Sequence, residues 1–243
     1  MLRFFLLGGL LYLFVGLASA QTDELPYLYK VTTVRAAPSE LLDLINLYKE
    51  QMEFYVANGD HAPFWMRHSQ GDQWDIMLLF PMDSYEAYYH PDRIESREGI
   101  GGDVQNQLNK LIAFQEDLFT YGPPLEVVQE AFDGAGFFHV EMFEALPGMH
   151  EELYEQRIME NEYLRHLRRP QNLIFVKSQG ASVDVFTLGF YRDIKHFAAS
   201  ADIPLDEEDA AAKAAGFDSV YSIGPYLRSL IREHHDTLAV AIR

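Results

Sequence analysis

The pattern of apolar and polar positions divides the chain into two stretches with the same order of predicted elements. In the first stretch, β-branched and aromatic residues predict a strand at 27–35, and apolar residues spaced by three and four predict a helix over 41–55. Two short apolar runs within 64–80 predict a hairpin. A helical region within 84–113 and a closing strand at 118–121 complete the order strand, helix, strand, strand, helix, strand.

The second stretch repeats this order. It predicts a strand at 137–143, a helix from 147 to about 167, a hairpin over 173–190, a helix-prone segment at 210–215 and a closing strand at 238–242. Pro170 ends the long helix because proline disfavours helical backbone in the residue before it.

A shared turn sets the alignment of the two stretches. Ser69-Gln70-Gly71 recurs as Ser178-Gln179-Gly180, an offset of 109 residues, and the same offset pairs Asp75 with Asp184 without a gap. Turns, strands and helices that agree at one offset indicate a tandem repeat.

The element order is that of the ferredoxin-like unit. A single unit covers one face of its sheet with helices, so the other face needs a partner, which a second copy can supply. We therefore predict an α+β fold in which two tandem ferredoxin-like (βαββαβ) repeats, 21–124 and 136–243, form an intramolecular dimeric α+β barrel. Residues 125–135 are predicted to be a linker.

Residues 1–20 are predicted to be a cleaved signal peptide. Arg3 precedes an apolar run over 4–18, and Ala18-Ser19-Ala20 is a small-residue cleavage site. The alternative is a membrane anchor, but the run is shorter than the roughly 20 residues that span a bilayer. We expect a periplasmic or secreted protein without stable membrane insertion after cleavage.

Composition narrows the classes of partner. The formal net charge is −18, and a strongly negative surface repels phosphate backbones, so nucleic-acid binding is not expected. The chain has no cysteine, so burial rather than disulfides must stabilise an exported fold. Aromatic residues make up 14% of the chain, which favours a packed core.

Strand phase supplies the first candidate site residues. Successive side chains of a strand point to opposite faces. If the more apolar phase packs under the helices, then Lys30, His139 and Glu141 point into the space between the two sheets, where they are candidate ligand-binding residues. The alternatives are that they form structural salt bridges, or that the phase is shifted by one residue.

The long helix of the second stretch supplies two more candidates. Arg157 and Asn161 stand where the first stretch has the apolar Tyr48 and Met52. Burial of such polar groups without partners costs free energy. They are therefore either exposed or paired with an internal group, for example Glu141.

The sequence contains no recognisable metal motif. His234-His235-Asp236 places neighbouring residues on opposite faces of a strand, and no paired-ligand spacing accompanies it. We accordingly predict neither a metal site nor a bound cofactor from the residues alone.

The element order, the helix lengths and the two Ser-Gln-Gly turns resemble the dimeric α+β barrel superfamily, with its NIPSNAP-like, EthD-like and antibiotic-biosynthesis monooxygenase-like families. The resemblance implies small-molecule chemistry. We predict an exported barrel that binds a small apolar or aromatic ligand between its sheets. The alternative is an enzyme, either a cofactor-independent monooxygenase or a haem-binding or haem-degrading protein, which would make His139 a base or an iron ligand. A homodimer beyond the internal pair stays open.

Overall fold

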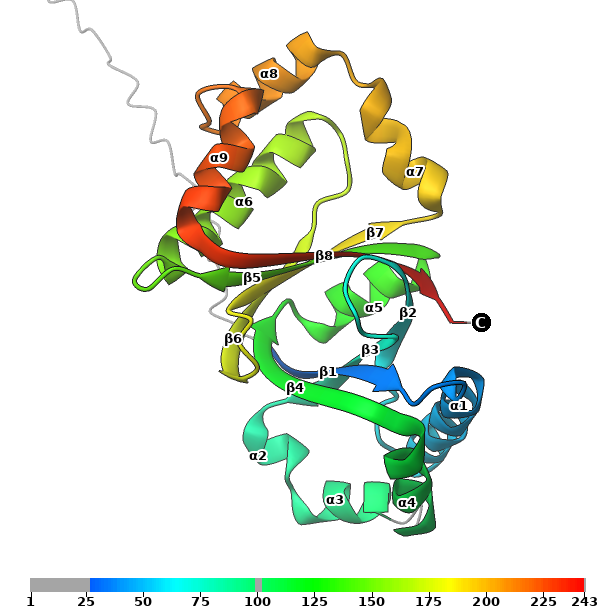
Figure 1. Ribbon diagram of the computed structural model, residues 1–243. Helices are drawn as coiled ribbons and strands as arrows, with labels where there is room; N and C mark the ends of the chain where they lie inside the picture. Colours follow the sequence, from blue (N-terminus) through cyan, green and yellow to red (C-terminus); the bar gives the residue numbers. More distant parts are fainter. Residues whose placement is uncertain (1–26, 99–101, 243) are drawn as a thin grey trace, which may run out of the picture.

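The computed structural model describes residues 27–98 and 102–242, and the predicted signal peptide lies outside this part of the chain. Within it, eight antiparallel strands form one closed barrel (Figure 1). The strands have the following bounds: β1 (Tyr27–Ala36), β2 (Phe64–Gln70), β3 (Ile76–Asp83), β4 (Ile112–Gly122), β5 (Phe137–Ala145), β6 (Leu173–Gly180), β7 (Val185–Tyr191) and β8 (Ile231–Ala241).

The strands of each half of the chain are neighbours in the barrel. The first half is ordered β4-β1-β3-β2 and the second half β8-β5-β7-β6. The halves join where β2 pairs with β8 and where β4 pairs with β6. The result is a ferredoxin-like α+β barrel whose two half-sheets face each other.

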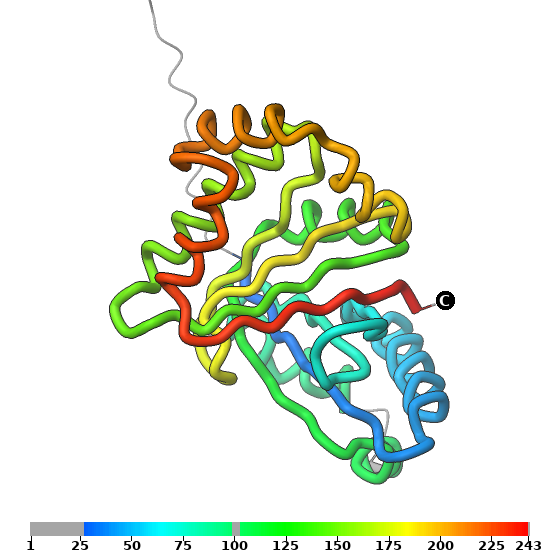
Figure 2. Tube along the Cα trace, turned by 45° about the horizontal axis from the view of Figure 1, so that its top comes forward, coloured from blue at the N-terminus to red at the C-terminus, as the bar shows by residue number. Residues whose placement is uncertain are grey.

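Helices cover the outer faces of both half-sheets (Figures 1 and 2). Those of the first half are α1 (Leu41–Ala57), α2 (Tyr85–Tyr88), α3 (Pro91–Glu98) and α4 (Gly102–Leu111). Those of the second half are α6 (His150–His166), α7 (Ile194–Ala198), the 3₁₀ helix η1 (Ala199–Asp202), α8 (Leu205–Ala214) and α9 (Val220–Leu230). No helix in the described ranges is long and apolar enough to cross a membrane.

The two halves use equivalent aspartates in the same way. Asp75 accepts a hydrogen bond from the Ala36 backbone N–H at 2.8 Å, and Asp184 accepts one from Ala145 at 2.9 Å. Each aspartate also donates its own N–H to the first strand of its half, to Val34 and Phe143 respectively. The offset of 109 residues read from the sequence therefore relates positions with the same hydrogen bonds.

The barrel interior is a packed apolar core to which both halves contribute. Tyr29 and Val31 from β1 and Phe138 and Val140 from β5 belong to one buried cluster. Further interior rings stack directly, with the Phe175 and Phe186 centroids 4.5 Å apart.

This core shows that the predicted strand phase is wrong. The apolar phase faces the space between the sheets, and Lys30, His139 and Glu141 therefore point outward, toward the helices. The physical reason is that a closed barrel has a drier interior than the sheet–helix layer, so the more apolar phase is stabilised there.

The segment predicted to be a linker forms helix α5 (Leu125–Asp133). It lies between the half-sheets, and Val128 is fully buried in the interior cluster (Figure 1). The Phe132 ring contacts Phe64, Phe138 and Phe190 at centroid distances of 4.8 to 5.2 Å. α5 thus fills the interior space that was predicted to hold a ligand.

The outer layers of the halves differ in polarity. Under α1, Val34, Ile76 and Leu78 pack against helix residues that include Tyr48 and Met52. Under α6, the apolar cluster is smaller, and Arg157 and Gln156 are buried beside it. Burial of polar groups without partners costs free energy, so the buried polar groups of this layer must be paired.

The hairpin glycines generate a prediction about the seams between the halves. Gly180 has φ +105°, and a Cβ there would overlap the backbone carbonyl oxygen of Asp117 on β4. Gly59 also has a positive φ, +81°, but open space around it. We expect Gly59→Ala to cost about 1 kcal/mol of unfolding free energy through backbone strain alone. Gly180→Ala should cost about 3 kcal/mol, because the seam must also move.

Urea unfolding of both variants measures this difference. Equal losses would show that positive φ, and not the close approach of β6 to β4, accounts for the glycine.

Candidate functional site

The candidate site lies on the outward face of β5 and β8, two neighbouring antiparallel strands. Glu141 on β5 is directly opposite Asp236 on β8. Residues two apart on a strand share a face, so His139 joins Glu141 and His234 joins Asp236 there. His235 lies on the opposite face, as the alternation predicted.

These four side chains are close enough to interact. His139 Nε2 and Asp236 Oδ1 are 2.5 Å apart, and His234 Nε2 lies 3.6 Å from Glu141 Oε1 and 3.7 Å from Asp236 Oδ2. One ligand atom each from His139, Glu141 and Asp236 lies within 4.8 Å of the others. The strand register therefore gathers two imidazoles and two carboxylates at one place.

Helix α6 contributes a buried guanidinium to this cluster. Arg157 is 2% exposed, donates to Gln156 at 2.7 Å, pairs with Glu160, and has Nη1 3.5 Å from Glu141 Oε2. The guanidinium carbon also lies 4.5 Å from the centre of the Phe143 ring. Arg157 is therefore paired with internal groups, one of which is Glu141, and is not exposed.

The environment shifts the ionisation of the carboxyl groups in opposite directions. Burial alone would raise the pKa of Glu141, but the His234 contact and the charge of Arg157 outweigh it and lower the pKa to about 2. For Glu160, burial outweighs the charge of Arg157 and raises the pKa. Glu141 is therefore the carboxylate held firmly in its charged form.

His139 experiences the same competition. Burial would lower the pKa of His139, but the hydrogen bond to Asp236 and the charge of Glu141 outweigh it and raise the pKa. The imidazole thus lies in a field of negative charge that favours a cation.

The side chains of the site range from buried to exposed. We call the buried Arg157–Glu141 pair the floor of the site and the accessible His139–Asp236 pair its rim. The Arg157 side chain is 1% exposed, that of His139 21% and that of Asp236 57%. The Phe197 ring adjoins the rim, with its centre 5.3 Å from that of His139, and the fully buried Phe143 ring stacks on His234 at 4.7 Å. The partly exposed His139 and Asp236 side chains therefore lie beside one aromatic ring.

The remaining predicted site residues lie elsewhere. β1 and β5 are on opposite sides of the barrel, so Lys30 does not meet His139. The Lys30 ammonium lies 4.6 Å from the Phe80 ring centre. Burial lowers the pKa of Lys30, because it outweighs the opposite effect of the nearby Asp117 charge.

Asn161 has a structural contact. Its side chain donates to the Asn172 carbonyl and accepts from the Asn172 N–H, both at 2.8 Å. It thereby ties α6 to the segment that leads into β6.

Sequence reasoning missed His234, Asp236 and Glu160 as members of the site. The i, i+2 spacing of His234 and Asp236 was a signal that both share a strand face. The pairing of β8 with β5, which brings them to His139 and Glu141, is not readable from that spacing.

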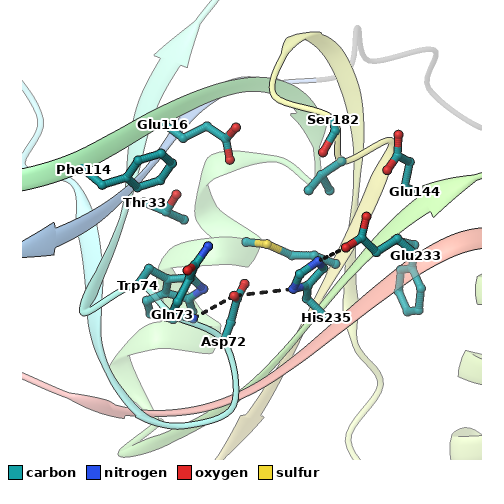
Figure 3. A pocket seen from close by; sticks show the side chains of 13 residues that line it. Thr33, Asp72, Gln73, Trp74, Phe114, Glu116, Glu144, Ser182, Glu233 and His235 are labelled. Atoms are coloured by element: carbon teal, nitrogen blue, oxygen red, sulfur yellow. Dashed lines mark hydrogen bonds and ion pairs between the residues drawn. The ribbon is translucent and has the colours of Figure 1, made fainter.

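A second polar region lies at one mouth of the barrel (Figure 3). A cavity of about 280 Å³ is lined there by Trp74, Phe114, Glu116 and other residues of both halves. His235 bridges two carboxylates, with ring nitrogens 3.4 Å from Asp72 and 3.0 Å from Glu233. This mouth is separated from the candidate site by the β8 strand itself.

Comparisons with known proteins identify the fold. No protein-family model matches the chain, and no curated protein sequence is significantly similar to it. Among solved structures, an anthrone oxidase-like protein is similar over 90% of this chain and 93% of its own, with a TM-score of 0.58 and 11% identity. This likeness supports the α+β barrel fold described above.

Two further structures agree with this fold. A protein from Fusobacterium nucleatum subsp. nucleatum, provisionally named a monooxygenase, covers 90% of this chain and 93% of its own, with a TM-score of 0.54 and 8% identity. A protein provisionally named a chlorite dismutase covers 89% and 95%, with a TM-score of 0.51 and 11% identity. At such identities the likeness concerns the fold alone.

The buried pairing of Arg157 leads to a stability prediction. Arg157→Met removes the partner of a buried Glu141 and should cost about 3–5 kcal/mol of unfolding free energy. The double variant Glu141→Leu/Arg157→Met should lose less, because no uncompensated charge remains.

Arg165→Met on the same helix is the matched control. Arg165 pairs with Glu162 on the surface, where the side chains are 55% and 42% exposed, so the free energy of unfolding should hardly change. Urea unfolding measures all three variants. Equal stability of the Arg157 and Arg165 variants would contradict a structural role for the buried pair.

Proposed function

We propose that this chain is an exported protein, built from two tandem ferredoxin-like copies, that binds a small aromatic molecule beside His139 and Asp236 and oxidises it as an oxidase- or monooxygenase-type enzyme. The observation that carries the proposal is the accessible His139–Asp236 pair, set between the Phe197 ring and a buried charged floor.

The rim and the floor have different roles in this proposal. An aromatic ligand packs against Phe197, whose ring centre is also 5.2 Å from that of Tyr191. A hydroxyl group of the ligand hydrogen-bonds to His139 or Asp236 at the rim. Arg157 and Glu141 hold each other in place below, so the polar groups are preorganised.

The position of the apolar core supports a ligand outside the barrel and not between the sheets. Side chains of both half-sheets and of α5 occupy the interior. The layer under α6 and α7 instead combines polar groups with aromatic rings, the composition typical of small-molecule sites.

The named neighbours favour an oxidative reaction over simple binding. An anthrone oxidase-like protein and a protein provisionally named a monooxygenase share the fold. Assignment to the NIPSNAP-like, EthD-like or antibiotic-biosynthesis monooxygenase-like family remains a prediction of the sequence.

The described residues do not fit a haem group at this site. The Nε2 atoms of His139 and His234, which would have to bind the iron, are each directed at a carboxylate oxygen. The carboxylates of Glu141 and Asp236 on this face would repel the propionates of haem. We expect haemin added to the purified protein to keep its free spectrum. A Soret shift lost in His139→Ala would instead favour the haem alternative.

Oxygen uptake tests the proposed activity. We expect the protein as purified to consume oxygen with anthrone or with members of a hydroquinone panel, and His139→Asn to lower kcat/KM by about tenfold or more. His235→Asn is the matched control, because it alters the neighbouring residue on the other face of β8 and should leave the rate unchanged.

Two results would overturn the proposal. The first is no oxygen uptake and no ligand-induced change in the fluorescence of the protein across the panel. The second is a loss of activity in His235→Asn but not in His139→Asn, which would move the reaction to the mouth of the barrel.

A further inference from the structure

We propose that His139, His234, Glu141 and Asp236 form a site for one divalent first-row transition-metal ion. The inference deepens the proposed function, since it concerns the same site, but its evidence and its test do not require turnover. Imidazole nitrogens and carboxylate oxygens are the ligands that such ions prefer in proteins.

One ligand atom each from His139, Glu141 and Asp236 lies within 4.8 Å of the others, and His234 adjoins this set of three. Two ligands bound at 2.0–2.2 Å to one metal lie about 3.0–3.5 Å from each other. The His234 Nε2 atom is 3.6 Å from Glu141 Oε1 and 3.7 Å from Asp236 Oδ2, slightly longer than that separation. The β5–β8 register places all four donors on one sheet face, which leaves the outer coordination positions for water or a ligand.

The short contact between His139 and Asp236 also fits a metal site. His139 Nε2 and Asp236 Oδ1, 2.5 Å apart, share a hydrogen bond. An ion between the four groups would take the place of that proton, as metal ions do when they bind protonated ligand sets. The two atoms would then have to move apart by about 0.5–1 Å to reach the ligand separation expected around one ion.

Outer contacts orient the ligands. Arg157 and the Thr187 hydroxyl hold Glu141 Oε2, at 3.5 and 3.1 Å, which leaves Oε1 on the side of His234. The His234 ring is stacked on Phe143 with an interplanar angle of 8°, which fixes its plane. Such contacts are typical of metal sites, where they set the ligand orientation.

The local charge favours a cation. Glu141 and Asp236 supply carboxylates on this face, and the Arg157 guanidinium of α6 pairs with Glu141 and Glu160. A divalent ion would balance the negative charge that Arg157 does not neutralise. Two imidazoles among the donors favour Mn²⁺, Fe²⁺, Co²⁺ or Zn²⁺ over Mg²⁺ and Ca²⁺, which prefer oxygen ligands.

Cobalt and zinc binding to the full chain tests the site. After dialysis against a chelator, we expect Co²⁺ to give a saturable visible absorption band and calorimetry with Zn²⁺ to give one ion per chain. Bound ion should also raise the Tm, because it stabilises the folded state. His234→Ala should weaken Zn²⁺ affinity about 10- to 100-fold or more.

Two further variants make the test specific. His235→Ala, on the opposite face of β8, should bind Zn²⁺ as the unmodified protein does. Glu141→Gln should weaken binding like His234→Ala, and circular dichroism checks that both variants are folded. Absence of saturable binding in the unmodified protein would overturn the proposal. Loss of binding in His235→Ala but not in His234→Ala would do the same, since it would place the ion at the barrel mouth.

The metal site and the proposed oxidase activity can fail separately. Zinc binding lost in His234→Ala, without oxygen uptake on any panel compound, would support the site and overturn the reaction. Oxygen uptake by a protein that binds neither Co²⁺ nor Zn²⁺ would support the reaction and overturn the site.

Discussion

The shared apolar interior of the closed barrel is the constraint on which the rest of this structure depends. Each half-sheet buries one face against the other, and α5 fills the space between them. Interior burial of aromatic and β-branched side chains is the dominant stabilising contribution that this topology offers. Since a strand alternates, the choice of inner residues also decides which residues point outward.

That choice places polar groups in the sheet–helix layer of the second half. In the first half, the outer layer is apolar, and α1 packs there through residues such as Tyr48 and Met52. In the second half, His139 and Glu141 occupy the outer phase, and Arg157 from α6 lies above them. The same architecture therefore carries an ordinary core layer on one side and a charged site on the other.

Some features were predictable because they depend on local patterns. The order of strands and helices and the two hairpins appear in the structure, and Asp75 and Asp184, which are 109 positions apart, accept matching backbone hydrogen bonds. Pairing of Arg157 with Glu141 was among the alternatives, because a charged residue at an apolar helix position needs a partner when buried. The linker and the strand phase were less predictable, because short segments and single strands lack a local signal for what they contact.

The sequence by itself determined the α+β class, the element order and the identity of the unusual residues His139, Glu141 and Arg157. Only the tertiary structure decided that these residues face outward, and that Lys30 lies on the far side of the barrel. It also brought His234 and Asp236 to His139 and Glu141 across the β5–β8 ladder. The physical reason is that strand pairing joins residues nearly 100 positions apart, and their proximity depends on closure of the whole barrel.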